Sequence, residues 1–189
     1  MGMLFNLRQV NREDAKKLID DPSDIYFFLY GEEMYQPEKK KGFFSRFFGK
    51  AEEKQNRREW IEPKEEDILD LDKLWHILHY IFARKAWGGT LPEGTLLLGG
   101  TELGNIDIGY GPARAILENE ISNFSKFLES LNQEEFAKGI TAQEIDENEV
   151  YYPEWSDEEA SNLWETVLEL RAFFKDAKEK GSAVIMYLY

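Results

Sequence analysis

The chain has two histidines, His76 and His79, and Asp72 precedes His76 by four positions. On a helix, residues at i, i+4 and i+7 lie above one another on one face. Two imidazoles and a carboxylate could hold a divalent metal, with Glu102 or Asp107 as a further oxygen ligand, or could act as acid and base near neutral pH. They could equally be core residues, with Asp72 fixing the tautomer of a hydrogen-bonded imidazole. The stripe alone assigns no metal, cofactor or catalytic residue.

A glycine-rich segment supplies the second candidate site. Eight of the fourteen glycines lie between positions 88 and 111, and the segment ends in the run Gly-Tyr-Gly-Pro-Ala-Arg at 109–114. Arg114 could pair with a phosphate or carboxylate while Tyr110 stacks on a ligand. The spacing matches neither a P-loop nor a dinucleotide fingerprint. The alternative is a tight turn in which Arg114 neutralises acidic groups of the protein itself.

Aromatic side chains extend the list of residues that could contact a ligand or partner. Trp75 adjoins His76, and Tyr152 and Trp155 lie in the aromatic segment 151–155. Such residues are enriched at interfaces, but they could also fill the core. Together with Glu102, Tyr110 and Arg114, they predict an aromatic-rimmed cleft beside the histidines.

Residues 36–66 form a tract that reads as an insertion. Its part 36–58 carries eight Lys and Arg against three Glu, a local charge of +5. On a helix its phenylalanines would share one stripe, with basic residues off it, as in a short amphipathic anchor. They could bind a membrane surface or a partner's groove, or dock onto the protein's own core. The four are Phe43, Phe44, Phe47 and Phe48.

Periodicity predicts strands at both ends of the chain and helices between them. Asn11, Asp70, Asn119 and Ser156 each suit a helix N-cap, and Gly181 suits a helix end. The expected strands are 4–10, 95–98, 113–117 and 183–189. We therefore expect an α+β fold: a small mixed or antiparallel sheet that includes the N- and C-terminal strands, packed with about five or six helices.

Composition bounds the protein's class. The chain has 189 residues, 42% of them hydrophobic, which predicts a single domain over 1–189. It contains no cysteine, so disulfides and thiol chemistry are excluded. No signal peptide or membrane-spanning run is evident, so a cytoplasmic location and no stable membrane insertion are expected. The net charge of −14 disfavours nucleic acid. The negative charge either serves solubility alone or attracts a basic protein partner.

These features together resemble the YfbM-like family, a bacterial domain of unknown function. The matching residues include Met1-Gly2-Met3, the Leu-Asp-Lys-x-Trp-His-x-Leu-His run at 71–79, the run at 109–114 and Tyr152-Pro153 with Trp155. The C-terminal Gly181 and the strand after it match as well. The resemblance spans nearly the whole chain and implies a compact α+β domain in a bacterial cytoplasm. It implies no activity, cofactor or catalytic residue.

The function expected first is a non-enzymatic binding module for a protein partner or a small ligand. An alternative is a small hydrolase or transferase, with His76 or His79 as general base and Arg114 binding an anionic group. A third is an immunity-type inhibitor of a basic toxin, suggested by size and acidity. The sequence leaves the oligomeric state open.

Overall fold

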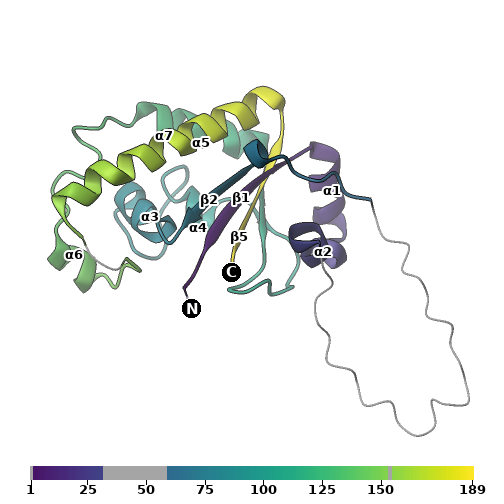
Figure 1. Ribbon diagram of the computed structural model, residues 1–189, viewed down its shortest axis with the longest axis horizontal. Helices are drawn as coiled ribbons and strands as arrows, with labels where there is room; N and C mark the ends of the chain where they lie inside the picture. Colours follow the sequence, from purple (N-terminus) through teal and green to yellow (C-terminus); the bar gives the residue numbers. More distant parts are fainter. Residues whose placement is uncertain (1, 32–58, 153–154) are drawn as a thin grey trace, which may run out of the picture.

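The computed structural model describes residues 2–31, 59–152 and 155–189, and its centre is one five-stranded antiparallel sheet (Figure 1). The strand order is β2-β1-β5-β4-β3. The strands are β1 (Phe5–Val10), β2 (Ile68–Asp72), β3 (Thr101–Glu102), β4 (Arg114–Ile116) and β5 (Ala183–Leu188). The α+β fold and the inclusion of both terminal strands in the sheet are confirmed.

The two terminal strands pair along their whole length at the centre of the sheet. Their register runs from Phe5 opposite Leu188 to Val10 opposite Ala183. All six residues of β1 are buried, because helices cover both faces of the sheet here. Alternate residues therefore enter two separate cores.

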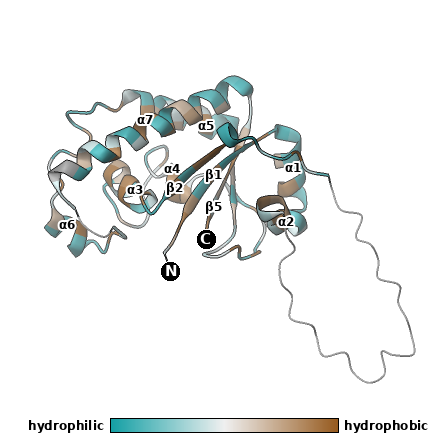
Figure 2. Ribbon diagram, in the orientation of Figure 1, coloured by the Kyte–Doolittle hydropathy of each residue, from teal (hydrophilic) through white to brown (hydrophobic). Residues whose placement is uncertain are grey.

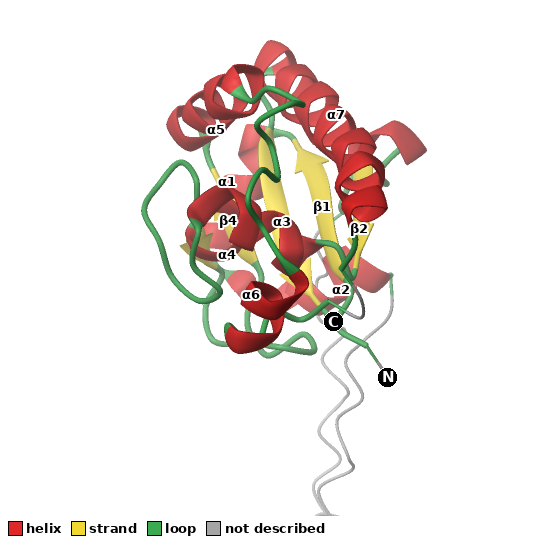
Figure 3. Ribbon diagram, turned by 90° about the vertical axis from the view of Figure 1, so that its left-hand side faces the viewer, coloured by secondary structure: helices red, strands yellow, loops and turns green. Residues whose placement is uncertain are grey.

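Helices form a layer on each side of the sheet (Figure 1). One layer holds α1 (Arg12–Asp20) and α2 (Ile25–Tyr30), joined by a 3₁₀ turn at Pro22–Asp24. The other holds α3 (Trp75–Ala83), α4 (Thr95–Leu98), α5 (Glu118–Ser130), α6 (Ala142–Glu147) and α7 (Asp157–Lys180). Figure 3 looks onto this layer, which includes α3 and α7. A second 3₁₀ turn, Glu65–Asp67, leads into β2. The larger core lies under α3, α5 and α7, and the smaller one under α1 and α2. Figure 2 shows the hydrophobic residues gathered on the strands and on α3.

The predicted helix caps explain several boundaries. The side chain of Asn11 accepts from the N–H of Asp14 at the start of α1, and Ser156 accepts from Glu159 at the start of α7. Gly181 ends α7 in the left-handed conformation, with φ of 65°. Asn119 is not a cap, because α5 already begins at Glu118.

Two predicted elements are wrong. Residues 95–98 form the short helix α4 rather than a strand, since the amides of Leu98 and Gly99 bond back to the carbonyls of Gly94 and Thr95. Asp70 does not cap the central helix. It lies in β2, where apolar and polar residues alternate and pair with β1, and α3 begins only at Trp75.

Of the expected insertion at 36–66, residues 59–66 belong to the described part of the chain. Phe43, Phe44, Phe47 and Phe48 lie outside the described residues. Within the described part, no helix has the length and apolar character needed to cross a membrane.

Candidate functional site

Helix α3 is buried on every side, so its polar residues must find partners inside the protein. Residues 75–82 are all buried. The helix ends at Arg84, which adopts the left-handed conformation with φ of 53° and turns the chain back over the helix. The returning loop, residues 84–94, follows directly.

His76 is fully buried, and both of its ring nitrogens are hydrogen-bonded. Nδ1 accepts from the backbone N–H of Tyr151 at 2.8 Å, and Nε2 lies 2.7 Å from the carbonyl oxygen of Ala86. A backbone N–H only donates and a carbonyl only accepts, so the proton of the neutral ring is on Nε2. Desolvation lowers the pKa of His76 below its usual value, more than the bond to Ala86 raises it.

His79 contacts the same loop two residues further on. Its Nε2 donates to the carbonyl oxygen of Gly88 at 3.0 Å, and the side chain is fully buried. Nδ1 has no hydrogen-bond partner among the described residues. Burial is the main cause that lowers the pKa of His79 to about 4. The ring is therefore neutral at physiological pH.

The two histidines together position Trp87, because they bind the carbonyls on either side of it. The indole of Trp87 lies 4.3 Å from the ring of His76, which stacks on Trp75 at 4.7 Å on a nearly parallel plane. Trp87 nevertheless remains 58% exposed. The result is an exposed indole on a rigid, buried aromatic base. Sequence reasoning missed this residue, although a tryptophan before two glycines, just beyond the histidine helix, was a usable signal.

Asp72 does not join the histidine stripe. It is the last residue of β2, with φ of 47°, and its N–H bonds to the side chain of Asp70. The predicted spacing of i, i+4 and i+7 requires one continuous helix, which begins only after Asp72. Among the described residues, no group of three or more His, Cys, Asp or Glu is arranged to hold a metal ion.

Arg114 lies in β4 and binds the backbone of the segment after α4. Its guanidinium donates to the carbonyls of Leu98, Gly99 and Gly100 and pairs with Glu102 at 2.8 Å. These contacts brace the glycine turn that leads into β3. Arg114 and Glu102 are thus brought together, but their hydrogen bonds join a different segment from the loop that the histidines bind.

The other aromatic candidates divide between two places. Tyr110 is 50% exposed, and its backbone N–H bonds to Leu188 at the end of β5. Tyr152 and Trp155 lie near each other, with ring centroids 6.4 Å apart, and both pack against the larger core. The Tyr152 hydroxyl donates to Glu159 in α7. Tyr151, which binds His76, directly precedes Tyr152 in the chain. The segment that carries Tyr152 and Trp155 is therefore attached to the histidine site.

Comparisons with known proteins give a family and a fold. A family model described as a domain of unknown function, DUF1877, matches residues 1–187. No curated protein matches the chain. A similar solved structure is the crystal structure of YfbM, a protein of unknown function from Escherichia coli. The match covers 98% of this chain and 99% of the YfbM chain, with a TM-score of 0.63 and 18% sequence identity. That likeness concerns the fold alone.

Proposed function

Because the chain belongs to the DUF1877 family, whose function is unknown, we propose its function from this site: it is a non-enzymatic binding module that contacts a protein partner through Trp87. The observation that carries the proposal is an indole 58% exposed to solvent yet held by two buried histidines. Tryptophan is enriched among the residues that dominate binding energy, and a fixed side chain loses little entropy on binding.

The loop around Trp87 suggests the chemistry of the partner. Leu91 in the same loop is 49% exposed, and Arg84 and Lys85 are exposed just before Trp87. A complementary surface would offer an apolar pocket for the indole with acidic residues beside it. Tyr152 and Trp155 would extend the aromatic rim of the binding surface.

The histidine geometry gives the enzymatic alternative less support. A general base must reach the proton that it removes, directly or through one water. His76 uses both ring nitrogens within the protein, and His79 is fully buried with Nε2 bonded to Gly88. The guanidinium of Arg114 donates to three backbone carbonyls and to Glu102. In this proposal all three residues have structural roles.

An immunity-type role remains a second candidate because of the charge of −14. Such a role predicts a strongly basic partner, whose association would slow steeply as ionic strength rises. Binding through Trp87 predicts a weaker dependence on salt. Association rates at low and high salt therefore distinguish the two candidates.

The proposal is tested by co-purification of the tagged full chain from its native host. Trp87→Ala is compared with Tyr110→Ala, which removes an aromatic ring of similar exposure at the end of β5. We expect a stoichiometric partner with the wild type and with Tyr110→Ala. Loss of a central tryptophan should weaken binding of the purified partner about thirtyfold.

Two results would contradict the proposal. One is a wild-type chain that is always recovered alone. The other is a partner held equally well by Trp87→Ala and the wild type. Circular dichroism of each variant checks that the fold is intact.

A further inference from the structure

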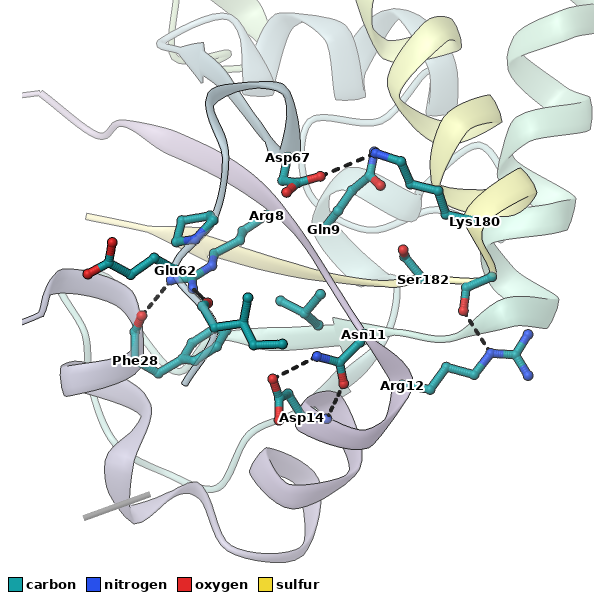
Figure 4. A pocket seen from close by; sticks show the side chains of 14 residues that line it. Arg8, Gln9, Asn11, Arg12, Asp14, Phe28, Glu62, Asp67, Lys180 and Ser182 are labelled. Atoms are coloured by element: carbon teal, nitrogen blue, oxygen red, sulfur yellow. Dashed lines mark hydrogen bonds and ion pairs between the residues drawn. The ribbon is translucent and has the colours of Figure 1, made fainter. Parts of the chain in front are cut away.

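A cavity on the opposite side of the sheet from the histidines contains a buried arginine. It has a volume of about 320 Å³ and lies between β1, the segment 61–67 and the C-terminal end of α7 (Figure 4). Its walls include Asn11, Asp14, Phe28, Asp67 and Lys180. The volume is near the lower end of the range for small-molecule sites.

Arg8 supplies the central charge of this cavity. It is 5% exposed, and its guanidinium lies 3.9 Å from the centre of the Phe28 ring. Its terminal nitrogens donate to the backbone carbonyls of Phe28 and Ile61. Its Nε is buried and has no hydrogen-bond partner among the described residues. Burial lowers the pKa of Arg8 despite the acidic groups around it.

No described carboxylate pairs with this guanidinium. The residues opposite Arg8 in the neighbouring strands are Ile68 and Ile185. Asp14 instead bonds to Asn11 and Lys17, and Asp67 pairs with Lys180 at 3.3 Å. A buried cation without a direct counterion is costly, and two carbonyls do not supply a charge.

The donors that remain suit a planar or tetrahedral oxyanion. A guanidinium has five N–H groups, and two carbonyls satisfy only part of them. Arg12 and Lys180 add positive charge at the cavity, while Asp14, Glu62 and Asp67 balance it. The acidic protein as a whole would repel a polyanion, so the fitting ligand is small and carries one anionic group.

We propose that this cavity binds a small molecule through an oxyanion, a carboxylate or phosphate, which takes the unpaired donors of Arg8. Binding here is independent of the partner surface at Trp87. The oxyanion would supply the counterion that the described residues do not.

The experiment titrates the full chain with sodium phosphate and, separately, with sodium acetate, against sodium chloride at matched ionic strength. The readout is the side-chain Nε–H resonance of Arg8 in nitrogen-15 NMR spectra. We expect a saturable shift with a dissociation constant of about 1 mM or tighter for at least one of the two anions. The anion that binds identifies the class of ligand group.

Matched substitutions test whether Arg8 carries the binding. Arg8→Lys keeps the charge but removes Nε and the planar fork. Binding to this variant is followed by the backbone amide resonances of the residues that line the cavity, and it should be at least about tenfold weaker than in the wild type. Arg171→Lys is the control, because Arg171 also faces an aromatic ring, Trp164, and backbone carbonyls, in the other helical layer. It should bind as the wild type does.

The proposal is overturned if neither anion shifts the Arg8 resonance saturably, if Arg171 responds equally, or if folded Arg8→Lys binds as tightly as the wild type. Should Arg8→Lys fail to fold, the resonance of the wild-type protein still decides the question.

Discussion

The Nδ1 atom of His76 accepts a hydrogen bond from the backbone N–H of Tyr151 at 2.8 Å. The ring thereby joins α3 to the loop that follows it, at Ala86, and to the distant chain that follows α6. Its contribution is structural, since a neutral imidazole with both nitrogens bonded connects two backbone groups that would otherwise be buried without partners.

Replacing His76 by phenylalanine should destabilise the fold while keeping a flat ring between Trp75 and Trp87. The change leaves the Tyr151 N–H and the Ala86 carbonyl unpaired, and each lost partner costs about 1–3 kcal/mol. We expect the free energy of unfolding in urea to fall by roughly 2–6 kcal/mol. A loss within the range of neutral surface substitutions would show that these bonds contribute nothing.

His79 should make stability depend on pH. Its pKa is about 4 in the folded protein and about 6.5 when unfolded, so the unfolded chain binds the proton first as pH falls. Stability should therefore be retained above about pH 6.5 and decline towards pH 4, with roughly 2 kcal/mol lost from this group by pH 5.

The measurement is urea unfolding at pH 7 and pH 5. His79→Gln is the comparison, since its amide can still donate to the Gly88 carbonyl but does not titrate. The difference in unfolding free energy between the two pH values should be smaller in the variant by the stated amount. Equal pH dependence in both proteins would show that His79 does not cause the loss of stability at pH 5.

Arg114→Lys should destabilise the turn before β3. A lysine cannot span three carbonyls and Glu102 at once, because it lacks the planar fork. We expect a loss of about 2–3 kcal/mol in thermal or urea unfolding. Glu102→Gln removes only an exposed ion pair and should cost under about 1 kcal/mol. Equal effects of both changes would count against the bracing role.

Gly100→Ala tests the close approach of this turn to β4. Gly100 has φ of 75°, and a Cβ there would lie 2.6 Å from the carbonyl oxygen of Ala115. Gly139 is the matched control, with φ of 79° and open space around its Cβ position. Gly139→Ala should cost about 1–2 kcal/mol from the backbone conformation alone. Gly100→Ala should cost clearly more, measured as a larger fall in melting temperature.

The parts of the fold that local pattern determines could be predicted from sequence. The strand 183–189, the caps at Asn11 and Ser156 and the end at Gly181 each follow from residues within one turn or strand. The prediction of a helix cap at Asp70 is wrong because the apolar positions of α3 continue back to Leu71, while the pairing with β1 that makes 68–72 a strand is non-local.

The site needed tertiary contacts that no spacing reveals. Trp87 matters because Ala86 and Gly88 happen to fold back onto α3. Arg8 reads in sequence as an ordinary strand residue, and only the sheet register shows that two isoleucines flank it. The burial of α3 follows from apolar side chains around the whole helix, and that property is local.

The adjacency of β1 and β5 has a consequence for how the chain folds. Asn6 bonds to Tyr189, 183 positions later, so the middle of the sheet cannot form until nearly the whole sequence is available. Folding should be slow for a protein of this size, since such distant pairing carries a large loop-closure cost. The same adjacency favours circular permutation: Leu4 and Tyr189 exchange backbone hydrogen bonds, and a short linker could join them while new ends open at an exposed loop.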